Sequence, residues 1–356
     1  MEHANDAMAL LDMIPRPAFC VRGGLIIKVN QAAERLFLQT GTEIQKLLLT
    51  GAEEYASFSD GRLYLTLNVS GQALGFSVNR ISGADYFRME QDGDNSELQA
   101  MALAARELRD PLASVMVTAE RLFPVSGLSD DPGTRELVAR INRGLLQMLR
   151  VISNMSDANR YSTDTPARQE VHNICAFLDE VFSRASELVQ HGGITLEYTG
   201  HPEAVYTLLD SEKLERAVYN IISNAMKFTP KGGIIRAALT RRKNKLYLSI
   251  QDNGTGIPEP VRADIYSRYC REPGIEDGRF GIGLGMVLIR AAATLHGGTV
   301  LIDHPENAGT RITMSLQIRP GNGTQLRSPA FRVDYAGERD HGLLELSDAL
   351  PSELYK

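Results

Sequence analysis

Two runs of apolar residues with heptad spacing lie near the middle of the chain and restrict its fold more than any other feature. In the first run the steps alternate between three and four, at Leu98, Met101, Ala105, Leu108, Leu112, Val115, Ala119 and Leu122. The second run follows at Val138, Ile141, Leu145, Met148, Ile152 and Met155. This spacing is typical of a helix in a coiled coil or a bundle. Because about ten residues join the runs, we predict an antiparallel hairpin over residues 96–160, which buries its seam best as a homodimeric four-helix bundle.

The segments on either side of this hairpin mix strand and helix patterns. Residues 1–92 contain short β-rich runs separated by Gly and Asn, with a helical stretch at NQAAERLFL. After Pro166 the chain alternates strands with helices, the latter expected at Ser211 to Phe228 and at Leu284 to Leu295. We therefore predict a multidomain α+β protein in which residues 170–318 form an α/β sandwich, with helices covering one face of an open sheet.

The composition excludes several classes of protein. With 43% hydrophobic and 23% charged residues the chain is globular, and a net charge of -6 does not favour a nucleic-acid partner. Cys20, Cys175 and Cys270 lie far apart without CxxC spacing, so neither a disulfide framework nor a zinc site is indicated. No apolar run suffices for a membrane span and the N-terminus lacks the basic start of a signal peptide, so we expect a cytoplasmic protein.

The first of three segments with chemical potential is LERAVYNIISNAMKFTP. Asn220, Asn224 and Lys227 lie four and three residues apart, so they share one face of the expected helix. Leu214 and Val218 fall on the opposite, core-facing side. Taken alone, two carboxamides and one ammonium group also fit an ordinary solvated surface.

The other two segments are rich in glycine. In DNGTGIP, Asp252 ends a strand and can accept a hydrogen bond from an exocyclic amine, while Gly254 and Gly256 allow the backbone to turn tightly near a ligand. In GIGLGM, three glycines lead into a helix whose N-terminal N–H groups can hold an anion; they are Gly281, Gly283 and Gly285. Because this pattern is not GxGxxG and no strand leads directly into it, a dinucleotide fold is not favoured.

In this order the three segments resemble the N, G1 and G2 boxes of the histidine-kinase ATPase domain, and LHGG and GTRITM further along are two more matches. The hairpin is similar to the dimerisation domain of the sensor histidine kinase family. LLDMIPRPAFCVRGGLIIKVNQAAERLF resembles the opening of a PAS sensor domain, with an unrelated small α+β domain as the alternative. We expect no haem or flavin in this PAS-like part.

The resemblance implies that the C-terminal domain binds ATP and Mg²⁺. Asn224 would ligate Mg²⁺, and Asn220 would support its water shell. Lys227 would contact the terminal phosphates, Asp252 would bind the adenine amine, and Gly281 to Gly285 would wrap the phosphates. The family also implies a response regulator receiver domain or a partner kinase as the interacting protein.

Residues 259–280 match the mobile ATP lid of the family. Arg268, Arg271 and Arg279 of this stretch either contact nucleotide phosphate or form a solvated basic loop.

The phosphoacceptor expected from the family is missing. Its motif, His followed by Glu, Leu, Arg, a small polar residue, Pro and Leu, aligns with RELRDPL, so Arg106 stands where the His is expected. A guanidinium stays protonated and has no lone pair to attack a phosphate, so we predict that ordinary His autophosphorylation does not occur. Glu107, the family's base toward that His, is then better interpreted as a solvated helix residue.

Two functions therefore stay open. One is an enzyme that transfers a phosphoryl group from ATP to protein, at another acceptor or on a partner bundle. The other is a degenerate kinase that uses ATP as a conformational ligand. An anti-sigma serine kinase is disfavoured because that branch lacks a hairpin, and rapid hydrolysis is not expected because the gyrase and chaperone branches usually carry Glu where Asn220 stands.

Residues 319–356 lie outside the family pattern and have no predicted role. Four leucines could form a short helix that docks on the ATPase domain or on a partner: Leu343, Leu344, Leu346 and Leu350.

Overall fold

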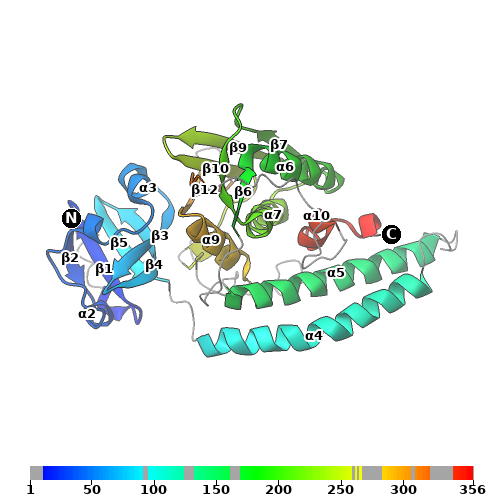
Figure 1. Cartoon of the computed structure of the whole chain (residues 1–356), viewed down its shortest axis with the longest axis horizontal. Helices are drawn as coiled ribbons and strands as arrows, with labels where there is room; N and C mark the ends of the chain where they lie inside the picture. The colour runs from blue at the N-terminus through cyan, green and yellow to red at the C-terminus, as the bar shows by residue number, and fades with distance from the viewer. Residues whose placement is uncertain are drawn as a thin grey trace.

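The computed structural model describes residues 11–90, 95–123, 132–160, 169–258, 261–262, 264–266, 283–305, 309–320 and 340–355. A β-rich N-terminal part lies beside an α/β C-terminal part, and a long helical hairpin runs alongside the latter (Figure 1). The predicted mixed α+β architecture is confirmed. Among the helices of the described ranges, none has the length and apolar character of a membrane span.

The N-terminal part is an antiparallel sheet of five strands in the order β2-β1-β5-β4-β3. The strands are β1 (Ala18–Arg22), β2 (Leu25–Val29), β3 (Arg62–Val69), β4 (Gln72–Ile81) and β5 (Ala84–Met89), and the short helices are η1 (Leu11–Met13), α2 (Gln31–Glu34), η2 (Ile44–Lys46) and α3 (Ala52–Ser57). Buried Asn30 begins α2: its oxygen accepts the N–H groups of Ala18 and Ala33, and its amide donates to the carbonyl of Arg16. One side chain thus joins the helix start to the first strand.

The hairpin consists of α4 (Asn95–Leu122) and α5 (Pro132–Arg160). Within one chain the two helices bury Ala105, Leu112 and Met116 against Leu145, Leu149 and Ile152. Several predicted seam residues are instead exposed by 43% or more: Leu108, Val115, Leu122, Ile141 and Met148. The contacts inside a single chain therefore bury only part of the predicted seam and also include Met116 and Leu149, while burial of the rest by a second copy stays a prediction.

The C-terminal part is a sheet covered on one face by helices. Its sheet strands β7 (Thr195–Thr199), β9 (Ile234–Arg242), β10 (Lys245–Asp252), β11 (Val300–Asp303) and β12 (Arg311–Gln317) run in the order β11-β12-β10-β9-β7, with β7 parallel to β9. β6 (Glu170–Asn173) and β8 (Tyr206–Leu209) form a separate pair. The helices α6 (Ile174–His191), α7 (Ser211–Phe228) and α9 (Gly285–Leu295) share one apolar core with the sheet. The two helices predicted after Pro166 match α7 and α9 within one residue at each end.

The two sheets join into one sheet of ten strands, a feature that the sequence did not predict. Edge strand β3 pairs antiparallel with edge strand β11, with Tyr64 opposite Val300. The hydroxyl oxygen of Tyr266 lies 2.7 Å from the carbonyl oxygen of Arg62 and 2.9 Å from that of Val300, one on each side of the junction. Lys245 reaches across to Glu54 at 2.7 Å. The N-terminal part is therefore tied directly to the C-terminal sheet, and not only through the hairpin.

Residues 340–355 form α10 (His341–Glu345), a turn, and η5 (Ser352–Tyr355). Leu344, Leu346 and Leu350 are buried, whereas Leu343 is only partly so. The expected docking helix exists, and it contacts both the C-terminal part, through α6 and α7, and the hairpin, through α5 (Figure 1).

Candidate functional site

A cavity of about 170 Å³ lies between the helices of the C-terminal part and the hairpin. Its walls come from α5, α7, the end of β10 and the residues that follow it, the start of α9, β12 with the residue before it, and the turn after α10. Of the residues predicted from the sequence, six line it: Asn220, Asn224, Lys227, Asp252, Gly283 and Gly285. Three separate sequence segments therefore meet at one concave surface that mixes apolar walls with a few polar groups, as ligand sites do.

Helix α7 supplies the asparagines and the lysine. It begins after Asp210, whose side chain accepts the Lys213 N–H, and its other side is buried in the core. Asn224 is half-buried and makes no side-chain hydrogen bond within the described part of the chain. The Nζ of Lys227 lies 3.3 Å from a carboxylate oxygen of Asp348. The amide of Asn220 is already engaged, since it accepts from Arg150 at 3.3 Å.

Asp252 is the buried acid at the end of β10 and is 6% exposed. The N–H groups of Gly254 and Thr310 donate to its Oδ1 at 2.9 and 3.2 Å, so the second oxygen is available to a ligand. Burial raises the pKa of Asp252, and the two backbone donors oppose that rise. The arrangement holds one carboxylate oxygen fixed in an apolar wall, where it can accept a hydrogen bond from an amino group.

The glycines keep the backbone close to this site. A Cβ at Gly254 would lie 2.3 Å from the Phe228 carbonyl oxygen, which means that only glycine fits between β10 and the end of α7. Gly283 has a φ of +75° just before α9. Gly254 and Gly256 support the turn without lining the cavity, and Gly281 lies outside the described residues. The predicted lid over residues 259–280, with Arg268, Arg271 and Arg279, also lies largely outside them.

The residues present fit a nucleotide carrying a metal ion. Lys227 and Arg150 already hold a carboxylate at the polar end of the cavity, so an anionic group is accommodated there. Asn224 offers an oxygen of the hard type that Mg²⁺ prefers, and Mg²⁺ commonly takes its other ligands from phosphate and water. Asn220 is a weaker candidate for the metal, because its oxygen faces Arg150.

The sequence reasoning did not find the polar residues that the hairpin and the C-terminal segment contribute to the cavity. Arg150 and Asn154 come from α5, and Asp348 comes from the turn after α10. No local motif marks any of them, since each reaches the site through long-range packing. Their presence means that the cavity is built by the hairpin and the C-terminal segment as well as by the α/β part.

Arg106 and Glu107 lie elsewhere, on α4. Both side chains are exposed, next to the buried Ala105, and neither lines the cavity.

Comparison with known proteins agrees with this geometry. Residues 209–320 match the family described as histidine kinase-, DNA gyrase B- and HSP90-like ATPase. The chain is 27% identical over 237 residues to Histidine kinase P4 of Formosa agariphila. The aligned region covers 64% of this chain and 17% of that protein. It is 25% identical over 320 residues to the sensor histidine kinase WalK of Bacillus subtilis, covering 83% of this chain and 52% of WalK.

Among solved structures, full-length ShkA in complex with AMPPNP superposes with a TM-score of 0.50 at 19% identity, over 63% of this chain and 47% of that one. This similarity concerns the fold alone. The chain spans about half of WalK and about one sixth of Histidine kinase P4. The part that matches the family is an ATPase domain of the histidine kinase type, and sensor histidine kinases are among the relatives of the chain.

Proposed function

We propose that the protein is an ATP- and Mg²⁺-binding signalling protein of the sensor histidine kinase kind, whose ordinary phosphoacceptor has been lost. The observation that carries the proposal is the single cavity in which Asn224, Lys227 and Asp252 meet. Asn224 and Lys227 come from α7 and Asp252 from the end of β10, and each has the chemistry that one part of a nucleotide requires.

In this proposal Asp252 accepts a hydrogen bond from the adenine amino group, because its free oxygen is held in the apolar wall. Lys227 binds the terminal phosphates, and Asn224 ligates the metal. A bound Mg²⁺ would neutralise part of the negative charge of the phosphates. Gly283 and Gly285 let the phosphates approach the start of α9, where backbone N–H groups favour an anion.

We propose the arrangement of domains on the same basis: a PAS-like domain over residues 1–92, a dimerisation hairpin over 96–160 and the catalytic domain over 170–318. The five-stranded order of the first sheet supports the PAS-like domain. The exposed stripe that includes Leu108 and Val115 supports homodimerisation into a four-helix bundle, since such a stripe is buried by a second copy. A receiver domain or a partner kinase is the proposed downstream partner.

Arg106 restricts how the protein could act as a phosphotransferase. A residue that stays protonated cannot accept a phosphoryl group, so phosphotransfer requires another acceptor, in this chain or in a partner. The alternative is a degenerate kinase that uses ATP as a conformational ligand. That alternative is favoured by one observation, the contact between Lys227 and Asp348, which engages the proposed phosphate-binding lysine inside the protein itself.

The test is incubation of the purified protein with γ-labelled ATP and Mg²⁺, beside Asn224→Ala and Arg106→His variants, with nucleotide binding measured in parallel. Binding that Asn224→Ala weakens supports the proposed site. Label on Arg106→His but not on the natural protein supports the regulatory output. Acid-stable label on the natural protein that Asn224→Ala removes indicates a Ser or Thr acceptor and refutes the degenerate-kinase alternative. No binding of ATP by the natural protein refutes the proposal as a whole.

A further inference from the structure

Residues 340–355, here called the tail, are an ordered part of the fold. They pack between α5 of the hairpin and α7 of the ATPase domain (Figure 1). Leu344 and Leu346 are fully buried there, and the Asp340 side chain begins α10 by accepting the Leu343 N–H at 3.0 Å. The apolar anchors and the helix cap together hold the tail in one place.

Polar side chains of α5 hold the backbone of the tail. Arg143 and Gln147 both donate to the Ser347 carbonyl, at 2.9 and 3.0 Å, and Asn142 donates to the Tyr355 carbonyl at 2.9 Å. Hydrogen bonds to main-chain carbonyls depend on the path of the tail and not on its side chains. The hairpin therefore fixes the register of the tail.

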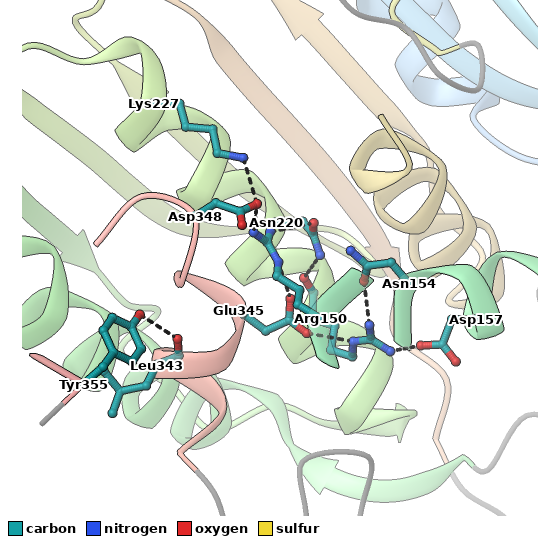
Figure 2. Close-up of polar contacts among 10 residues, drawn as sticks. Arg150, Asn154, Asp157, Asn220, Lys227, Leu343, Glu345, Asp348 and Tyr355 are labelled. Carbon is teal, nitrogen blue, oxygen red and sulfur yellow. Dashed lines mark hydrogen bonds and ion pairs between the residues drawn. The ribbon is translucent and has the colours of Figure 1, made fainter. Parts of the chain in front are cut away.

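The tail contributes an acid to a buried ionic network, drawn in Figure 2. Glu345, fully buried, accepts from Arg216 of α7 at 2.9 Å and from Arg150 of α5 at 3.2 Å. Arg216 also donates to Asn154 of α5 at 2.7 Å and pairs with Asp157. One carboxylate of the tail thus links a helix of the hairpin to the helix that carries the asparagines of the site.

A second acid of the tail enters the candidate nucleotide site itself. The Oδ2 atom of Asp348 lies 2.5 Å from Arg150 and 3.3 Å from the Nζ of Lys227, and all three side chains are at most 10% exposed (Figure 2). Asp348 also lines the cavity together with Asn224 and Asp252. Its carboxylate therefore occupies the cationic end of the site, at the group proposed to bind phosphate.

From these contacts we infer that the tail is an internal competitor of ATP: the Asp348 carboxylate holds the place of nucleotide phosphate on Lys227 and Arg150, and ATP binding displaces it. The inference rests on the proposed function, since it requires that the site takes a nucleotide. It also gives Arg150 a role, as a residue of the hairpin that binds phosphate once Asp348 leaves.

The physical reason is competition between two anions for the same buried cations. Phosphate and carboxylate cannot both approach Lys227 closely, because like charges at a desolvated site repel each other. The tail then lowers the affinity for ATP by the same factor by which bound ATP weakens the docking of the tail, as thermodynamic linkage requires. Since the tail also bridges α5 and α7, its displacement would loosen the contact between hairpin and ATPase domain, and nucleotide occupancy would be passed to the hairpin.

The experiment measures the affinity of the full chain for AMPPNP with Mg²⁺, and for adenosine, by isothermal titration calorimetry. The variant is Asp348→Asn, which keeps the size of the side chain and removes its charge. The matched control is Glu353→Gln, an exposed acid of the same tail. We expect AMPPNP to bind roughly tenfold tighter to Asp348→Asn than to the natural protein, a difference of about 1.4 kcal/mol. Adenosine, which has no phosphate, should bind both equally, and the control should match the natural protein.

Each other outcome has a distinct meaning. Equal AMPPNP affinity in Asp348→Asn and the natural protein overturns the competition while leaving ATP binding intact. Weaker AMPPNP binding in Asp348→Asn also overturns it, because Asp348 would then assist the nucleotide, for example as a ligand of Mg²⁺. If the natural protein and both variants bind neither adenosine nor AMPPNP, the proposed function fails, and the inference fails with it.

A second measurement needs no variant and guards against an Asp348→Asn chain that does not fold. Hydrogen exchange of the natural protein is followed for peptides of the tail, alone, with adenosine, and with AMPPNP and Mg²⁺. Faster exchange at the Leu346 and Leu350 amides with AMPPNP but not with adenosine supports displacement by phosphate. These amides donate inside the tail, at 2.9 and 3.0 Å, so their exchange reports its unfolding. Unchanged or slower exchange at saturating AMPPNP overturns the inference.

Discussion

Replacing Glu345 with Gln should release the tail more than any other single substitution in it. The side chain is 0% exposed and accepts from two guanidinium groups, of Arg150 and Arg216. Removing one partner of a buried ion pair typically costs about 3 to 5 kcal/mol. Here each arginine keeps a second acidic partner, Asp348 or Asp157, so we expect the lower end, about 3 kcal/mol.

Hydrogen exchange of the α10 peptide is the assay, because it reports the free energy of local opening. A loss of about 3 kcal/mol corresponds to exchange that is roughly a hundredfold faster, and Glu353→Gln should leave the rate unchanged. A double-mutant cycle of Glu345→Gln with Arg216→Gln should give a coupling energy above about 1 kcal/mol, since the two side chains are in contact. Exchange in Glu345→Gln within about threefold of the control would refute the view that the buried network holds the tail.

Three further predictions concern other parts of the molecule. Gly61→Ala should destabilise the protein by at least about 1 kcal/mol more than Gly71→Ala, measured by urea unfolding. Both glycines have a positive φ, but only at Gly61 would an added Cβ meet the backbone of β11, at 2.3 Å, and so disturb the junction of the two sheets. Equal effects would contradict the clash. Burial lowers the pKa of His296, so the unfolded chain binds more protons than the folded one. The free energy of unfolding should therefore fall below about pH 6.5, by up to roughly 1.4 kcal/mol per pH unit. His296→Gln should flatten this dependence, and an unchanged slope would exclude His296 as its source. Leu108→Lys with Val115→Lys should convert the dimer proposed above to monomer in light scattering, and an unchanged mass would exclude this stripe as the interface.

Local patterns in the sequence predicted the elements well where the pattern itself determines the structure. Helix α7 begins at Ser211 after the capping Asp210 and ends at Phe228, the two residues predicted from the sequence, although its middle is buried on all sides and not on one face alone. The Asn224, Lys227 and Asp252 side chains were predicted to share a site, and they do line one cavity.

Long-range contacts could not be found in this way. Arg150 sits in an ordinary polar position of a heptad helix, and Asp348 follows a short leucine-rich stretch, so neither carries a local signal of its place in the cavity. The heptad rule also could not say which side of the stripe a single chain would bury, since that depends on the bend and rotation of α4 against α5. Met116 is buried for this reason although it lies outside the predicted seam.

The pairing of β3 with β11 has a practical consequence for work with separate pieces of this chain. Each strand lies at the edge of its own sheet, and within the described structure β11 is covered on its outer side only by β3. An ATPase fragment expressed without residues 11–90 would present the backbone groups of β11 to solvent, and the hydroxyl of Tyr266 would lose its contact with the Arg62 carbonyl. Uncovered strand edges recruit other chains. Aggregation of such a fragment would therefore reflect a missing neighbour, and nucleotide measurements are better made on the intact chain.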